Sequence, residues 1–221
     1  MSLGAVLGHL AASAALTDAL IRLGRRYVEF FFLYPVALRR TREISSLAAC
    51  VEQIFRERTS LFSRVGWNIR STPGFGVQAN GDRDPTCWET PVGITVYIAG
   101  KPALVMGVEF HGATLCVRQL QGIAGTKLDK NLQDWPKLFV QACTEFALAS
   151  GIKRVRIYRA DQGLFYHFPA NIVRCNGETL REAKKSLRQR MRRRYDGTAR
   201  QLHFIMKRSY GEWTNPNCAR P

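Results

Sequence analysis

Three short runs rich in β-branched and aromatic residues follow one another closely, and they constrain the fold of this chain more than any other feature. They cover Ile94–Ile98, Ala103–Phe110 and Thr114–Leu120. The connections Ala99–Pro102 and His111–Ala113 both carry glycine and are typical of tight turns. Because such short connections join neighbouring antiparallel strands, the sequence predicts a three-stranded antiparallel meander.

The segment after the meander has the pattern of a helix followed by a fourth strand. Apolar residues from Trp135 to Ala147 recur every three or four positions, as on one face of an amphipathic helix. Gly151 is a typical helix-ending residue, and Arg154–Tyr158 has the pattern of a strand. A strand, helix and strand in this order predict a parallel pair of strands joined by a helical crossover.

Two further amphipathic helices and a last strand complete the pattern. One helix is expected over 43–62 and the other from Leu180 to Leu202, and a strand or hairpin is expected over Phe204–Trp213. The predicted fold is therefore α+β, close to α/β in its element order. It has a mixed, mostly antiparallel central sheet with flanking helices and an N-terminal helical extension.

The pattern divides the chain into three parts. We expect residues 1–62 to form a helical region packed on the core. Residues 63–91 are expected to form a long loop rich in glycine and proline, and residues 92–221 the core itself. The first part contains two apolar runs, Leu3–Ile21 and Tyr27–Leu38, which arginines flank. We interpret both as packed helices, because no basic residue precedes the first run. A peripheral membrane protein that uses these runs is the alternative.

Basic residues are concentrated near the end of the chain. The formal net charge is +16, and residues 151–221 hold seventeen basic against five acidic side chains. Such an excess attracts anionic partners. Nine basic side chains lie within 181–200, mostly arginines, which favour bidentate recognition of phosphate or carboxylate. The candidates for binding nucleic acid or another polyanion are Arg188, Arg192, Arg193 and Arg194.

The six cysteines give no sign of a metal site. They are spread along the chain without a CxxC pair, so zinc-site spacing is absent. Cys116 and Cys143 fall in apolar periodic segments, where a small buried thiol is the simplest interpretation. We therefore expect no metal and a reduced, cytoplasmic (intracellular) chain, associated with a membrane only if the membrane alternative holds.

A glycine-containing stretch, Arg118–Thr126, is predicted as a turn after the third strand of the meander. Gly122 and Gly125 permit a close approach of the backbone to a ligand. Amides exposed between a strand and the following helix bind phosphate through hydrogen bonds and the helix dipole. Taken alone, a short turn of this kind is a weak motif.

The segment Gln119–Ala124 reads Gln-Leu-Gln-Gly-Ile-Ala and is similar to the acyl-CoA loop of the GNAT superfamily of N-acetyltransferases, which has the form Gln/Arg-x-x-Gly-x-Gly/Ala. The order of helix, strand, helix and hairpin that follows also resembles that family. The segment Tyr195–Phe204 is similar to the family's Tyr…Ala…Leu-Gly-Phe ending, with His203 in place of the glycine. One departure is Thr126–Asp134, which separates the loop from its helix.

The resemblance, which covers 92–213, implies transfer of an acyl group from acetyl-CoA or another acyl-CoA to an amine. Backbone amides around Val117 would orient the pantetheine arm. Tyr195 would be the acid that protonates the departing thiolate, although its spacing also places it on the apolar face of its helix. The residues implied to hold the pyrophosphate are Gln119, Gly122, Ala124, Gly125 and Thr126.

Glu109 is the candidate general base of such a reaction. It lies between the strand residues Val108 and Phe110, which would shield its carboxylate from water. An outward-facing strand residue is the simpler interpretation of Glu109, and His111 is an alternative base. Two non-catalytic alternatives are a polyanion-binding module based on the helix 181–200 and a GNAT-like chain that has lost its activity.

Overall fold

The computed structural model describes most of the chain from Arg39 onward. The apolar runs Leu3–Ile21 and Tyr27–Leu38 lie outside the described part except for Ile21, so their packing or membrane contact stays a prediction. Only the backbone is described for 67–73, 92 and 180–184. The described residues are 39–58, 67–73, 92–98, 101–123, 132–163 and 180–218, together with Ile21, Thr90 and Tyr166.

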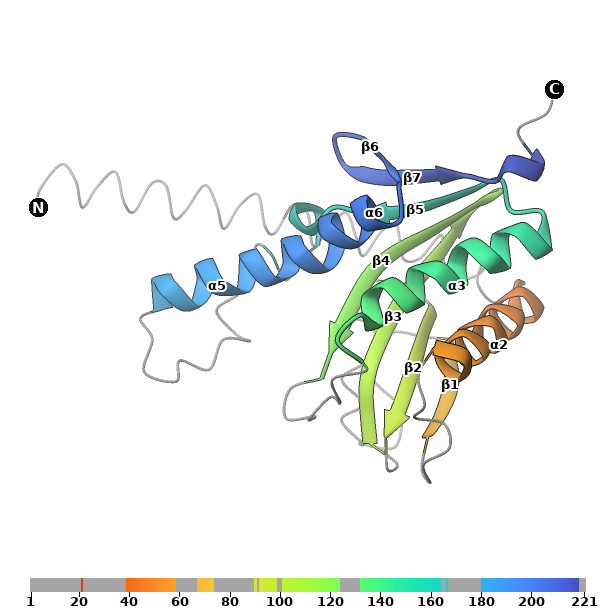
Figure 1. Ribbon diagram of the computed structural model, residues 1–221, viewed down its shortest axis with the longest axis horizontal. Coiled ribbons are helices and arrows are strands. Elements are labelled where there is room, and N and C mark those ends of the chain that lie inside the picture. The colour runs from red at the N-terminus through yellow and green to blue at the C-terminus, as the bar shows by residue number, and fades with distance from the viewer. Residues whose placement is uncertain are drawn as a thin grey trace, which may run out of the picture.

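A seven-stranded sheet forms the centre of the molecule (Figure 1). Its order is β1-β2-β3-β4-β5-β7-β6, and within the described strands only β4 and β5 pair in parallel. The strands are β1 (Trp67–Pro73), β2 (Val92–Ile98), β3 (Lys101–His111), β4 (Thr114–Gly122), β5 (Arg154–Tyr158), β6 (Ile205–Met206) and β7 (Tyr210–Thr214).

The predicted meander is confirmed as β2, β3 and β4, but two predictions beside it are wrong. The long loop expected over 63–91 contains β1, which pairs antiparallel with β2 from Trp67 opposite Ile98 to Pro73 opposite Val92. Proline is compatible with this position because β1 is an edge strand and Pro73 ends it. The turn expected from Arg118 begins later, because backbone pairing with β3 extends β4 to Gly122.

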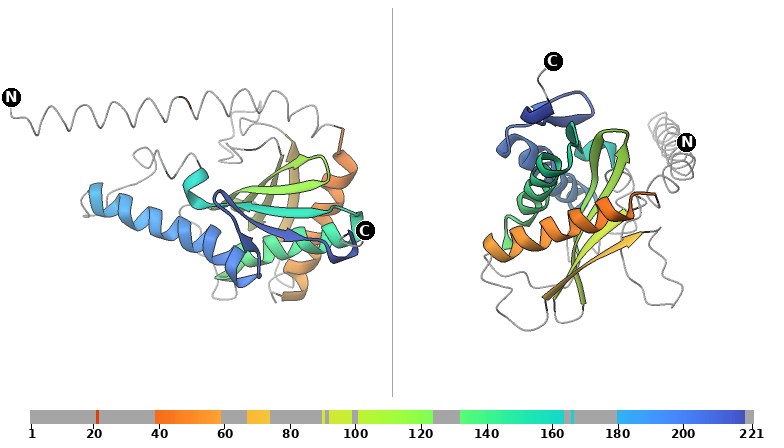
Figure 2. Two further views of the ribbon diagram at one scale, coloured as in Figure 1. Left: turned by 90° about the horizontal axis from the view of Figure 1, so that it is seen from above. Right: turned by 90° about the vertical axis from the view of Figure 1, so that its right-hand side faces the viewer.

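The helices α2 (Thr41–Arg58) and α3 (Trp135–Ser150) lie together on one face of the sheet (Figures 1 and 2). α3 has a proline in its first turn and ends at Gly151, whose φ is 70°. This left-handed residue is the predicted helix end. The crossover from β4 through α3 to β5 is likewise confirmed by the parallel pairing of β4 with β5.

The predicted basic helix forms as three consecutive pieces. They are α5 (Leu180–Arg192), a single π-helical segment (Arg193–Gly197) and α6 (Thr198–Gln201). The chain then turns through His203 into the hairpin of β6 and β7. In Figure 1, α5 extends outward beyond the sheet, whereas α6 lies close to β5 and β7.

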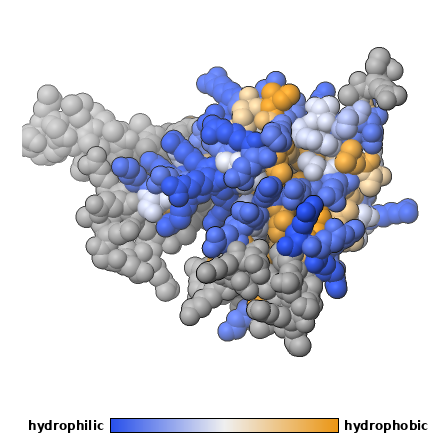
Figure 3. Space-filling model, viewed as in Figure 1, coloured by the Kyte–Doolittle hydropathy of each residue, from blue (hydrophilic) through white to orange (hydrophobic). Residues whose placement is uncertain are grey.

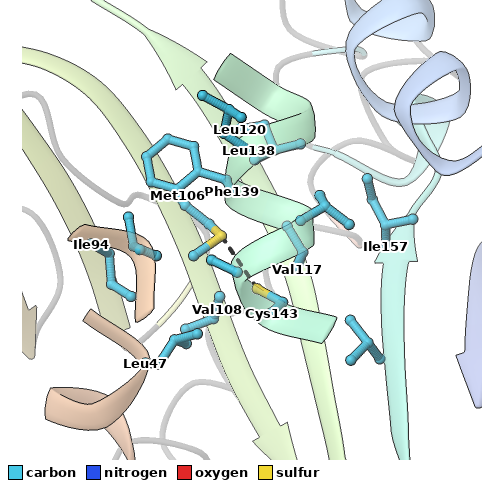
Figure 4. Close-up of a cluster of buried hydrophobic side chains, with 14 of the residues drawn as sticks. Leu47, Ile94, Met106, Val108, Val117, Leu120, Leu138, Phe139, Cys143 and Ile157 are labelled. Atoms are coloured by element: carbon cyan, nitrogen blue, oxygen red, sulfur yellow. Dashed lines mark hydrogen bonds between the residues drawn. The ribbon is translucent and has the colours of Figure 1, made fainter. Parts of the chain in front are cut away.

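The apolar core fills the space between the helices and the sheet. Phe139 of α3 contacts Phe55 of α2 with ring centres 5.1 Å apart, and the thiol of Cys143 lies 3.6 Å from the sulfur of Met106 on β3 (Figure 4). Both sulfur-bearing side chains are fully buried. Burial raises the pKa of the Cys143 thiol, as expected of the small buried thiol that the sequence predicts.

The coarse fold predicted from the sequence is confirmed: an α+β chain with a mixed sheet flanked by helices. The predicted helix over 43–62 is present as α2 and ends at Arg58 within the described residues. In the part of the chain that the structure describes, we find no helix with the length and apolar character needed to cross a lipid bilayer.

Candidate functional site: the edge of β4 and an arginine pocket

The strands β4 and β5 separate partway along their length. Their parallel pairing runs from Thr114 opposite Arg154 to Val117 opposite Ile157 and then stops, while β4 continues to Gly122. A bulge marks the point of separation. Successive residues of β3 pair with Gln119 and Val117, so the register of the ladder skips Arg118 between them. A bulge bends its strand and redirects side chains, which accounts for the departure of β4 from its neighbour.

Side chains of the π-helical segment bind β4 just beyond this point. The backbone N–H of Leu120 donates to the hydroxyl oxygen of Tyr195 over 2.7 Å, and Arg194 donates to the Leu120 carbonyl over 3.2 Å. Tyr195 is buried, and its ring belongs to the apolar core. It therefore lies on the apolar face of the helix, as its spacing predicts, and its hydroxyl also contacts the strand edge.

The next residue of the segment binds the chain on the β5 side. Asp196 accepts a hydrogen bond from the backbone N–H of Ala160 over 3.2 Å, and its other carboxylate oxygen lies 3.5 Å from Arg159. Both partners follow directly after β5. Adjacent residues of the π-helical segment thus bind the two strands where they have separated. Single π-helical turns inside helices are frequent at functional sites.

A pocket of about 280 Å³ lies between the first turn of α3 and the basic helix. We call it the arginine pocket. Its walls combine basic side chains with the first turn of α3, where the dipole of the helix favours an anion. Its lining residues are Gln133, Asp134, Trp135, Pro136, Lys137, Arg190, Arg193, Arg194, Thr198 and Gln201.

Arg194 joins the pocket to the strand edge. Its guanidinium carbon lies 5.1 Å from the centre of the Trp135 ring, at the start of α3, and the same group binds the carbonyl of Leu120. Burial lowers the pKa of Arg194 from its ordinary value, although an arginine remains charged at neutral pH. One half-buried cation therefore faces both the arginine pocket and β4.

The four arginines predicted to bind a polyanion do not share one surface. Arg188 and Arg192 lie on Tyr166: Arg188 donates to its carbonyl over 3.3 Å and Arg192 to its hydroxyl over 2.8 Å. Arg193 and Arg194 instead line the arginine pocket. Figure 3 shows hydrophilic side chains gathered on the side of the molecule where α5 extends. The basic helix therefore presents basic side chains on two sides. Arg188 and Arg192 lie on the side of Tyr166, and Arg193 and Arg194 lie on the side of the arginine pocket.

Glu109 is fully buried, so its interpretation as an outward-facing, exposed strand residue is wrong. Its carboxylate pairs with Arg118 over 2.5 Å and lies 3.0 Å from the Nε2 atom of His111. The side chain of His111 is 42% exposed, so it connects the buried carboxylate to the surface. The two candidate bases, Glu109 and His111, are thus in contact with each other. The candidate acid, Tyr195, instead contacts Leu120 of β4.

The other residues predicted to bind a cofactor lie mostly inside β4. Val117 is buried in the core, and Gln119 is buried with its amide donating to Gln121 over 2.7 Å. The carbonyl oxygen of the Gln119 side chain is buried and has no hydrogen-bond partner among the described residues. Gly122 pairs with Leu104 of β3. Ala124, Gly125 and Thr126 lie outside the described residues.

Three participants were missed by the sequence reasoning: Asp196, Trp135 and Lys137. Trp135 and Lys137 have the ordinary pattern of an amphipathic helix, and nothing local indicates the contact between α3 and the basic helix. Asp196 had a usable signal, since it is the acidic residue in the middle of a basic run.

Comparison with known proteins adds no identification. No protein-family model matches the chain, and no curated protein matches it by sequence. Among the residues that the structure describes, no group of three or more histidine, cysteine, aspartate or glutamate side chains is arranged to hold a metal ion.

Proposed function

We propose that this chain is an acyl-CoA-dependent N-acyltransferase of the GNAT-like type. The observation that carries the proposal is the separation of β4 from β5 after Val117, with the arginine pocket close by at the start of α3. Such a reaction needs an extended binding site for a pantetheine arm and an anion site for its nucleotide phosphates. The strand edge suits the first and the pocket suits the second.

The donor would bind with its phosphates in the arginine pocket. Arg190 and Arg193 supply guanidinium groups for the pyrophosphate, and Lys137 adds a point charge. The acyl-pantetheine arm would then extend toward Leu120, to which Arg194 connects the pocket. Positive charge at the phosphate end and an apolar strand edge at the thioester end match the two ends of such a donor.

The chemistry joins an amine to the thioester carbonyl. The amine nitrogen attacks the carbonyl carbon, a base takes the proton that the nitrogen loses, and the carbon–sulfur bond breaks as the thiolate leaves. Tyr195 is the residue proposed to protonate the thiolate. Glu109 is proposed as the base, with the exposed His111 passing the proton to water. Arg118 pairs with the Glu109 carboxylate and would orient it.

The backbone at His203 gives further support. His203 stands where the family's ending has a glycine, and its φ is 59°, in the left-handed region that favours glycine. A glycine, as in the family's ending, would suit this backbone conformation. The element order, with a crossover from β4 through α3 to β5 followed by the basic helix and a hairpin, also agrees with the resemblance.

The test is direct binding of CoA and acetyl-CoA, measured by isothermal titration calorimetry. We expect binding to wild type and a loss of at least tenfold in affinity for the double variant Arg190→Glu, Arg193→Glu. Arg200→Glu is the matched control, because Arg200 is an exposed arginine of α6 outside the pocket lining. An amine-acetylation assay on wild type then tests catalysis. Absence of binding at millimolar CoA would contradict the proposal.

A second candidate function is polyanion binding without catalysis. The observation that favours it is the set of exposed basic side chains along α5 and the start of the π-helical segment, which includes Lys185, Arg190 and Arg193. Binding to RNA or DNA that weakens steeply with salt would support this function, and the same double charge reversal should reduce the salt slope by about two. Binding of nucleic acid without binding of CoA would favour this candidate over the acyltransferase.

A further inference from the structure

The strand edge of β4 is already occupied by the chain itself. In a strand that ends a pairing, the outward N–H and C=O groups need new partners. Here the Leu120 N–H binds Tyr195 and the Leu120 carbonyl binds Arg194, so both backbone groups of this one residue are satisfied by the basic helix. Leu120 is 1% exposed, so water is excluded from these contacts.

One π-helical segment reaches both separated strands. An α-helix places consecutive side chains about 100° apart, and the wider π turn changes which faces Tyr195 and Asp196 present. Tyr195 then meets Leu120 on the β4 side, while Asp196 meets Ala160 after β5. The carboxylate of Asp196 anchors the segment independently of the Tyr195 hydroxyl, so this hydroxyl can leave Leu120 while the helix stays docked.

From these contacts we infer that the donor site at β4 is self-occupied: Tyr195 holds the Leu120 N–H in the ligand-free protein, and a donor binds by displacing the Tyr195 hydroxyl. The inference rests on the proposed function and adds regulation to it. The matching ligand carries two secondary amides, because the C=O of one accepts from the Leu120 N–H while the N–H of the other donates to the Leu120 C=O. The pantetheine arm of CoA has such amides.

The displacement also releases the proposed acid. The Tyr195 hydroxyl accepts from the Leu120 N–H, and its own hydrogen is directed at the Leu120 carbonyl oxygen 3.5 Å away. Once ligand amides take both Leu120 groups, the hydroxyl would turn toward the sulfur of the bound donor. Donor binding and placement of the acid are then the same event, and its cost is the lost Tyr195–Leu120 hydrogen bond.

The experiment measures CoA affinity of Tyr195→Phe by calorimetry. The phenylalanine keeps the ring in the core and removes only the hydroxyl. We expect about threefold to tenfold tighter binding of CoA, because the ligand no longer displaces a hydrogen bond. Acetyl transfer should become slower in the same variant. Tyr210→Phe is the control, since Tyr210 on β7 faces Arg156 and lies away from Leu120, and its affinity should equal that of wild type.

A second measurement needs no loss of the hydroxyl. Fluorotyrosine incorporated at position 195 should change its fluorine resonance when CoA saturates the protein, as the ring hydroxyl leaves Leu120. Equal or weaker CoA affinity of Tyr195→Phe, or an unchanged resonance at saturation, would overturn the inference while leaving the proposed function in place. Failure of wild type to bind CoA at all would overturn the proposed function, and the inference with it.

Discussion

The guanidinium carbon of Arg118 lies 3.6 Å from the centre of the Tyr158 ring. Arg118 is the bulged residue of β4, and Tyr158 is the last residue of β5, so this cation–π contact joins the two strands at the point where their hydrogen bonding ends. The same guanidinium pairs with the fully buried Glu109. One side chain therefore fixes the start of the separation and neutralises a buried carboxylate.

Replacing this arginine by a residue of similar length without charge should be costly. We expect Arg118→Met to lower the free energy of unfolding by about 3 kcal/mol, because it removes the guanidinium that pairs with the fully buried Glu109 carboxylate. Urea unfolding followed by circular dichroism measures the loss. The double variant Glu109→Gln, Arg118→Met should recover part of it. A double variant no more stable than Arg118→Met would show that the buried charge is not the cause.

Tyr158, the aromatic partner of Arg118, should make the free energy of unfolding depend on pH in the alkaline range. Burial raises the pKa of Tyr158 above its ordinary value, and the positive charge of Arg118 opposes this shift. A folded-state pKa above the unfolded value means that the folded chain holds the proton longer. The contribution of Tyr158 to the free energy of unfolding is therefore fully present below about pH 10, and it is lost as the pH rises through the pKa of Tyr158 in the folded protein.

Comparison of wild type with Tyr158→Phe isolates this contribution. The difference in free energy of unfolding between the two proteins should be constant up to about pH 10 and should shrink in wild type above it. The difference between the tyrosinate absorbance titrations of wild type and Tyr158→Phe should correspond to one tyrosine that titrates later than free tyrosine. A stability difference that stays constant up to pH 11 would contradict the assignment.

Hydrophobic spacing was enough to predict most elements of the fold. The glycine turns set the meander, Gly151 set the end of α3, and the length of the crossover set the parallel pairing of β4 with β5. β1 was missed because its residues lie between glycine- and proline-rich flanks and become a strand only by pairing with β2. Local pattern carries no signal for a strand that tertiary pairing creates.

The candidate site was predictable as a set of residue types and unpredictable as an arrangement. The spacing of Tyr195 predicted its apolar helix face, but the hydrogen bond to Leu120 depends on a π-helical turn that no periodicity announces. The dense run of arginines predicted an anion site. The arginines are in fact divided between Tyr166 and the arginine pocket. This division depends on the packing of α3 against the basic helix, which brings together residues far apart in the sequence.

A buried asparagine side chain fastens the end of α3 to the last strand. The side-chain amide of Asn215 donates to the carbonyls of Ala147 over 2.8 Å and Ile152 over 3.0 Å, and Asn215 is fully buried. Asn215→Ala should lower the free energy of unfolding by about 2 kcal/mol, since two buried carbonyls lose their donors. Thermal unfolding measures the effect.

The matched control for this asparagine is its neighbour Asn217. Asn217 is exposed, and the contact it makes to Asn215 uses its backbone N–H, so Asn217→Ala should change stability by less than about 0.5 kcal/mol. Equal losses in the two variants would mean that the amide of Asn215 does not hold α3 to the sheet.

Two helix ends share a left-handed backbone but carry different residues. Gly151 after α3 has a φ of 70°, and His203 after α6 has a φ of 59°. A side chain in this conformation costs about 1 to 2 kcal/mol, partly offset by the larger entropy that glycine loses on folding. His203→Gly should therefore raise the free energy of unfolding by about 0.5 to 1 kcal/mol, while Gly151→Ala should lower it by a similar amount.

Chemical unfolding of both variants beside wild type checks the pair. His203 is exposed, and the turn itself is held by backbone bonds from His203 to Arg200 and from Phe204 to Ala199, which the substitution leaves intact. The free energy of unfolding of His203→Gly should therefore rise without a change in its slope against denaturant concentration. A lower stability of His203→Gly would contradict this prediction. It would mean that the imidazole makes a contact whose free energy exceeds the strain of the left-handed backbone at this residue.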